Sequence, residues 1–193
     1  MDNVLNNYRI KLEEETKYKI PLFDKLSTHQ AKILAVLQDP GNSGAEKSGT
    51  CSIDNNDPTA FKQKEILENL NIDRKDVLFW NFYASYGLRL NKLKVEQKKF
   101  WANKLNDLVN LMPNLIIIVS LGNYSWEGFK YFPNDKVLRI LFAPHPSKRS
   151  MNLPGNVTLV IKGSKDDFVN DNMDELYRSE VLNLLSSTYY EVN

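Results

Sequence analysis

Hydrophobic and polar positions along this chain fall into blocks that predict strands and helices in turn. Short apolar or β-branched blocks indicate strands, and longer segments with apolar residues at helical spacing lie between them. We predict strands at 32–37, 76–81, 115–120 and 137–142, with a further edge strand at 157–161. We predict helices at 2–19, 59–70, 94–112, 123–131 and 172–186. This alternation favours an α/β fold, a three-layer α/β/α sandwich with a mainly parallel central sheet of about four strands.

Local signals indicate where several of these elements begin and end. Pro21 is expected to end the first helix. Asp57-Pro58 is a helix start signal for the second. The apolar run 115–120 is typical of a strand that is covered on both faces. The loop from Asp39 to Pro58 is rich in Gly, Ser, Asn and Asp, and a loop of that length in a compact domain is usually functional or mobile.

The size and composition indicate one globular domain. The 193 residues contain no repeat or linker, so we predict a single domain over 1–193 with residues 1–30 as an N-terminal helical extension. Hydrophobic residues make up 42% and charged residues 25%, which argues against disorder. The formal net charge of +1 gives no overall basic footprint, so any binding of nucleic acid would depend on local patches.

Cysteine and histidine usage limits the chemistry. Cys51 is the single cysteine, which excludes an internal disulfide and a cysteine-ligated iron–sulfur or zinc site. The two histidines are far apart in the sequence, so we expect no metal or cofactor. The N-terminus lacks the apolar segment of a secretory signal, and the longest apolar run, 115–119, is too short to span a bilayer. We therefore expect a cytoplasmic monomer that does not contact a membrane.

Polar side chains follow the predicted strands. Asp39 comes after the first strand and His145 after the fourth, while Asn81 and Ser120 end the two strands between them. Because ligands bind outside the carboxyl ends of parallel strands, these side chains would share one edge of the sheet. Asp39 lies in the motif LQDPG at 37–41, and His145 lies in the motif APHPSKRS at 143–150.

These motifs, in this order, resemble those of the uracil-DNA glycosylase superfamily over roughly residues 32–152. LQDPG is similar to its water-activating loop, LFWN at 78–81 to its pyrimidine-recognising strand end, and APHPSKRS to its HPS motif and minor-groove loop. IVSLGNYSW at 118–126 and SGTCSIDNNDPTA at 48–60 resemble the connecting segments. The resemblance implies a DNA glycosylase of base excision repair. Such an enzyme hydrolyses the N-glycosidic bond of uracil or a related deaminated base in DNA and leaves an abasic site.

The resemblance also assigns catalytic and base-binding residues. The Asp39 carboxylate would orient water and stabilise the cationic sugar, as a carboxylate does in glycoside hydrolysis. His145 would donate a hydrogen bond to uracil O2 as negative charge develops there. Asn81 would pair with O4 and N3–H of a flipped uracil, and Gln38 would offer backbone N–H groups to the pocket.

Departures from the family pattern affect the base pocket. Gly41 stands where some members carry a Tyr that blocks the thymine methyl group, so we expect a roomier pocket. Thr50 and Cys51 fall where the uracil-stacking Phe is expected, and Tyr83 or Phe82 could replace it. Leu37 replaces the usual Gly that opens the first motif.

Four polar residues are candidates for contact with DNA. Ser147 would contact phosphate or hold its loop, Lys148 would contact phosphate, and Arg149 would lie in the loop that wedges into the duplex. Ser43, in the polar cluster 43–48, could touch phosphates near the lesion.

Each assignment has a plainer alternative. Asp39 could only shape an Asp-Pro-Gly turn, His145 could be an ordinary loop residue, and Asn81 could be a satisfied strand-end amide. The departures also leave room for a non-catalytic protein that binds nucleic acid or a nucleobase on the same fold. A third alternative is an α/β hydrolase acting on a small nucleoside.

Overall fold

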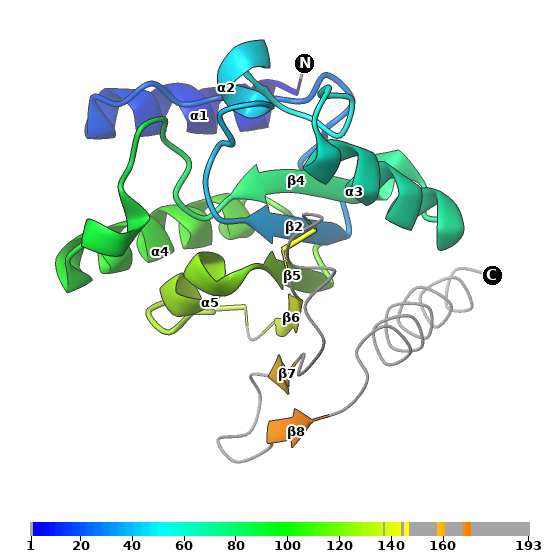
Figure 1. Ribbon diagram of the computed structural model, residues 1–193. Coiled ribbons are helices and arrows are strands. Elements are labelled where there is room, and N and C mark those ends of the chain that lie inside the picture. The colour runs from blue at the N-terminus through cyan, green and yellow to red at the C-terminus, as the bar shows by residue number, and fades with distance from the viewer. Residues whose placement is uncertain (1, 137, 144, 147–157, 161–167, 171–193) are drawn as a thin grey trace.

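The protein has an α/β fold built on a four-stranded parallel sheet (Figure 1). The computed structural model describes residues 2–136, 138–143, 145–146, 158–160 and 168–170. Within these ranges, the helices are all too short or too polar to cross a membrane.

The four strands have the order β4-β2-β5-β6, and every neighbouring pair is parallel. Their bounds are β2 (Ile33–Leu37), β4 (Val77–Asn81), β5 (Ile117–Leu121) and β6 (Arg139–Ala143). The predicted α/β class and its parallel sheet are confirmed. The chain passes from β2 to β4 on one side and then to β5 on the other, so the direction of winding reverses at β2.

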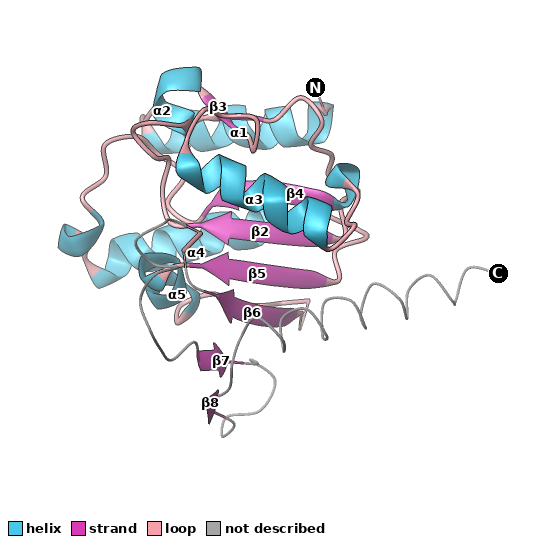
Figure 2. Ribbon diagram, turned by 45° about the vertical axis from the view of Figure 1, so that its right-hand side comes forward, coloured by secondary structure: helices cyan, strands magenta, loops and turns pink. Residues whose placement is uncertain are grey.

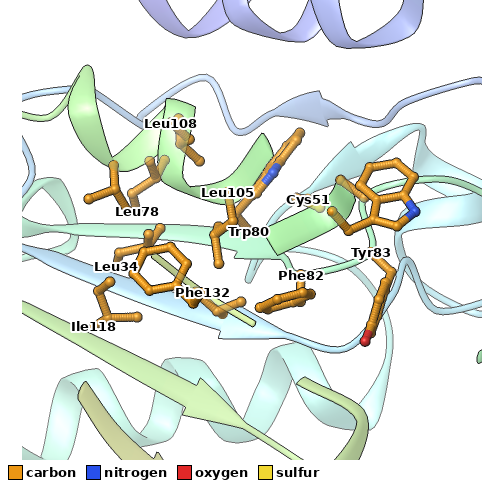
Figure 3. Packing of buried hydrophobic residues seen from close by; sticks show 14 of the residues in the cluster. Leu34, Cys51, Leu78, Trp80, Phe82, Tyr83, Leu105, Leu108, Ile118 and Phe132 are labelled. Atoms are coloured by element: carbon orange, nitrogen blue, oxygen red, sulfur yellow. The ribbon is translucent and has the colours of Figure 1, made fainter. Parts of the chain in front are cut away.

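Helices cover both faces of this sheet (Figure 2). α3 (Pro58–Asn69) lies on one face. The other face packs against α1 (Asn3–Thr16), α4 (Val95–Asn110) and α5 (Asn123–Phe129). Alternate strand residues therefore enter two separate hydrophobic clusters. Leu34, Leu78 and Ile118 belong to the larger cluster, part of which Figure 3 shows. Ile33, Val77 and Ile117 belong to the smaller one beneath α3.

Capping residues explain the bounds of α1 and α3. The Asp57 carboxylate accepts hydrogen bonds from the N–H groups of Thr59 and Ala60 at 2.9 and 3.1 Å, which starts α3 as predicted. α1 ends at Thr16, because Lys17 adopts the left-handed conformation with φ 59°. Pro21 therefore does not end this helix, contrary to the prediction.

The N-terminal segment is part of the core. Leu5, Tyr8 and Leu12 on α1 are buried, and the Tyr8 hydroxyl donates a hydrogen bond to the Lys104 carbonyl of α4 at 2.8 Å. Residues predicted as an extension thus help to cover one face of the sheet.

The loop after β2 is held in place by hydrogen bonds. It contains α2 (Ala45–Ser48) and β3 (Thr50–Cys51), which pairs with β1 (Leu22–Phe23). The Tyr86 hydroxyl donates to the Ala45 carbonyl at 3.0 Å. The buried Asp24 carboxylate accepts from Ser52 and, at 2.6 Å, from Arg74. Both halves of the loop are therefore tied to other elements.

Several short elements lie outside the central sheet and the helices that cover it. The 3₁₀ helices η1 (Arg74–Asp76) and η2 (Leu90–Lys92) precede β4 and α4. The predicted strand at 157–161 is present as β7 (Thr158–Val160), but it pairs antiparallel with β8 (Phe168–Asn170) in a separate two-stranded sheet. An antiparallel partner needs only a short connection, whereas a parallel one needs a long crossover. The helix predicted at 172–186 lies outside the described residues.

Candidate active site

A cavity of about 340 Å³ lies at the carboxyl ends of β2 and β4, on the face that α3 covers. Its walls come from the loop after β2, the first turns of α3, the ends of the two strands and the segment after β6. Five of the residues predicted for the site line it: Asp39, Gly41, Ser43, Asn81 and His145. These residues come from three separate parts of the chain, and the parallel sheet brings them together.

Asp39 presents a carboxylate to this cavity with little to compensate its charge. Burial raises the pKa of Asp39 to about 6. Among the described residues, no donor forms a hydrogen bond with its carboxylate. A side chain that only shaped a turn would bond to the backbone nearby. Both oxygens therefore remain available to a ligand or a water molecule.

Asn81 forms the floor of the cavity together with Cys51. Its side chain is 3% exposed, and its Nδ2 donates a hydrogen bond to the Cys51 Sγ at 2.8 Å. Burial raises the pKa of Cys51 to about 12, so the thiol stays protonated and uncharged. Asn81 reaches this side of the sheet because it continues the alternation of Val77 and Phe79. The floor is thus neutral, polar and fixed in orientation.

His145 lines the cavity from the segment that follows β6. Burial lowers its pKa, and the negative charge of Asp57 opposes that shift only in part. The imidazole is therefore neutral at pH 7 and carries one N–H donor. A neutral donor can stabilise an anion that forms in the cavity.

The structure adds Asp57 to the site. The sequence indicated this residue only as a helix cap, but its carboxylate also lines the cavity and acts on His145. A Cβ atom at Gly44 would overlap the Asp57 Oδ2, so a larger residue there would displace this carboxylate. The Asp-Pro signal predicted the cap, whereas the proximity to His145 depends on the packing of α3.

Gln38 points away from the cavity. Its side-chain Oε1 accepts a hydrogen bond from the Tyr124 N–H at 3.0 Å, and its side chain packs against Gly122. The residue before Asp39 thus contacts the β5–α5 turn. Neither its side chain nor its backbone lines the cavity, so the structure does not bring this predicted base-binding residue to the site.

Tyr83 and Phe82 also lie elsewhere. Both are 1% exposed, and their rings pack together in the larger cluster with centroids 4.9 Å apart (Figure 3). The structure does not bring Tyr83, which was predicted to contact the base, to the cavity, because the chain beyond Asn81 carries its ring to the opposite face of the sheet. Cys51 occupies the cavity floor instead.

The remaining candidates fall into two groups. Ser120 is buried in the core and its Oγ lies 2.9 Å from the Ser125 Oγ, so it does not share the edge with Asp39. Ser147, Lys148 and Arg149 lie outside the described residues, and their contacts with DNA stay predictions.

The described residues contain no group of three or more His, Cys, Asp or Glu side chains that could hold a metal ion. No family model matches the chain, and no curated protein matches it either. The geometry of the cavity and the motifs that line it are therefore the guide to function.

Proposed function

We propose that this protein is a DNA glycosylase that hydrolyses the N-glycosidic bond of uracil, or of a related deaminated base, in DNA. One observation carries the proposal. An unpaired carboxylate, a fixed carboxamide and a neutral imidazole line one cavity at the carboxyl ends of the strands, from Asp39, Asn81 and His145.

The orientation of the Asn81 amide suits an oxo-pyrimidine. One N–H of its Nδ2 bonds to Cys51, which leaves the second N–H free to donate to uracil O4. Its Oδ1 can accept from uracil N3–H. Cytosine presents a donor and an acceptor in the reverse positions, so the same amide would oppose it.

The chemistry would proceed on a base flipped out of the helix. As the bond between C1′ and N1 breaks, its electron pair moves into the base, and His145 donates a hydrogen bond to the O2 where negative charge develops. The Asp39 carboxylate stabilises the positive charge on the sugar. Asp39 then accepts a proton from water as the water oxygen attacks C1′, which leaves an abasic sugar and the base as its N1 anion. Proton transfer to that anion gives the free base and restores the Asp39 carboxylate.

A strand-cleavage assay tests this proposal. A labelled oligonucleotide with one uracil, as single strand or opposite G or A, is incubated with the protein in EDTA and then treated with hot alkali. We expect cleavage at the uracil that is lost in the Asp39→Asn variant. Matched oligonucleotides with T·G or hypoxanthine measure the base preference. Absence of cleavage on every substrate, from protein shown to be folded, would contradict the proposal and favour a non-catalytic nucleobase-binding protein.

A further inference from the structure

Gln63 occupies a position on α3 where an apolar residue would be expected. Ala60, Gln63 and Leu67 are all buried, and their spacing places them on the face of the helix that meets the sheet. Gln63 is only 6% exposed, like its apolar neighbours on that face. Glutamine is seldom buried to this extent without partners.

The Gln63 carboxamide lacks such partners. Its Nε2 is buried and, among the described residues, forms no hydrogen bond. Asn106 on α4 is equally buried, and although its Oδ1 has no partner among the described residues, its Nδ2 donates to the Asp135 Oδ2 at 2.7 Å. A desolvated donor without an acceptor destabilises the folded state, so a chain that keeps one calls for an explanation.

The place of Gln63 supplies that explanation. It lines the same cavity as Asp39, Asn81 and His145, six residues beyond the Asp57 cap. A ligand in the cavity can offer the acceptor that the protein does not. The atom without a partner is a donor, so the complementary ligand atom is an acceptor, such as the oxygen of a C=O group.

We propose that Gln63 is a specificity-determining residue, which donates a hydrogen bond to an oxo oxygen of the base in the cavity. This inference rests on the proposed function and deepens it. A carbonyl oxygen has two lone pairs, so Gln63 would donate to the same uracil O4 as Asn81 and add a second requirement for an oxo group there. A base that carries an amine at that place would leave two donors facing each other in a site with little water. Two amides would then select for bases in which deamination has replaced an amine by an oxo group.

The Gln63→Met variant tests the proposal with two independent measurements. Met has nearly the same shape but no hydrogen-bonding amide. We expect the melting temperature of the free protein to rise by about 2–4 °C, because an unpaired buried donor is removed. We expect cleavage at uracil, measured as kcat/KM, to fall about 5- to 100-fold, because the oxo oxygen loses its donor. Free uracil should also raise the melting temperature of the variant less than that of the wild type.

Asn106→Leu is the matched control, since it removes an equally buried amide whose N–H donor has an acceptor, Asp135. It should lower the melting temperature and leave cleavage unchanged. A lower melting temperature in Gln63→Met would show that the amide has a structural partner and would overturn the inference. Unchanged cleavage and uracil binding in Gln63→Met, beside an active wild type, would overturn it as well. A wild type that neither cleaves nor binds uracil would overturn the proposed function and, with it, this inference.

Discussion

The edge of the sheet at the carboxyl ends of the strands has two unlike halves on either side of β2. Toward β5, the Gln38 side chain fills the space by packing against Gly122 and bonding to the Tyr124 N–H. Toward β4, the cavity lies open and Asp39 faces it. In an open α/β sheet the ligand crevice usually lies where the direction of winding reverses, which here is between β2 and β5. In this chain the Gln38 side chain fills the space between β2 and β5, and the cavity lies instead at the ends of β2 and β4.

Gln38 and Asp39 are consecutive residues, but the first packs into the filled half and the second faces the open half. Gln38 and Leu37 accept backbone hydrogen bonds from Tyr83 and Phe82 at 2.9 and 2.8 Å, so the backbone before Asp39 is tied to the segment after β4. These bonds hold the backbone of Gln38 from the β4 side, and its side chain holds it from the β5 side. Contacts on both sides thus fix the backbone that presents Asp39 to the cavity.

Removing the charge from the open half should have the largest effect. We expect Asp39→Asn to lower cleavage at uracil about 100- to 10,000-fold, because the group that accepts a proton from water is lost. The same variant should be more stable at pH 8. Burial raises the pKa of Asp39 to about 6, so the ionised carboxylate destabilises the folded state above that pH.

Urea unfolding at two pH values measures the second effect. The partial exposure of Asp39 lets water screen its charge, so we expect a gain of roughly 1–2 kcal/mol at pH 8. The gain should shrink as the pH falls through 6 and vanish below about pH 4, where Asp39 is protonated in both the folded and the unfolded state. Equal cleavage at uracil by Asp39→Asn and the wild type would show that another group activates the water.

Replacing His145 should have the next largest effect on cleavage. We expect His145→Ala to lower cleavage about 100- to 1000-fold, as the loss of one donor to a developing anion does elsewhere. His145→Gln keeps a neutral N–H donor and should lose less. The ratio of the two rates in single-turnover cleavage isolates the hydrogen bond, and equal losses in both variants would contradict a donor role.

The sequence predicted the open half better than the filled half. Apolar blocks marked the strands, and parallel strands bring Asp39 and Asn81 to one edge whatever the details of packing. The same reasoning does not place Tyr83, because it lies beyond β4, where the alternation of side chains no longer indicates which face of the sheet a ring packs against. The end of α1 was misplaced because Lys17, in the left-handed conformation, carries no local signal in its residue type.

Gln63 and Asp57 show a second limit. A polar residue between Ala60 and Leu67 interrupts the apolar face of α3, and this was a signal that the sequence offered. Its meaning depends on the absence of a partner, which only the packed structure shows. Asp57 was recognised as a cap, but its effect on His145 requires segments far apart in the chain to meet.

The pH dependence of cleavage should be a smaller effect, and it also arises from Asp39 in the open half. With a pKa of about 6, Asp39 is mostly protonated at pH 5 and mostly ionised at pH 7. We expect single-turnover cleavage to rise about tenfold over this interval and then to level off. His145 has a lowered pKa and is neutral over the upper part of that range, although the nearby Asp57 charge opposes the shift. The residual activity of Asp39→Asn should lack the rise, and a rise that persists would assign it to another group.

The smallest expected effect compares two glycines, one in each half. Gly122 has φ +93°, and a Cβ atom there would lie 2.9 Å from the Gln38 Cδ. A Cβ atom at Gly41 would meet nothing within 4 Å. We therefore expect Gly122→Ala to lower the free energy of unfolding by about 1–3 kcal/mol, and Gly41→Ala to change it by no more than about 0.5 kcal/mol.

Truncating Gln38 separates the two causes of the Gly122 effect. In a Gln38→Ala background the close contact is gone, but the left-handed backbone at Gly122 remains strained by any side chain. The cost of Gly122→Ala should then fall without reaching that of Gly41→Ala, and urea unfolding of the four variants of this double-mutant cycle gives the coupling. Zero coupling would show that Gln38 does not fill the space beside β5. A coupling of about 1 kcal/mol would support the packing of Gln38 against Gly122, which fills the β5 half of the edge and leaves the β4 half open.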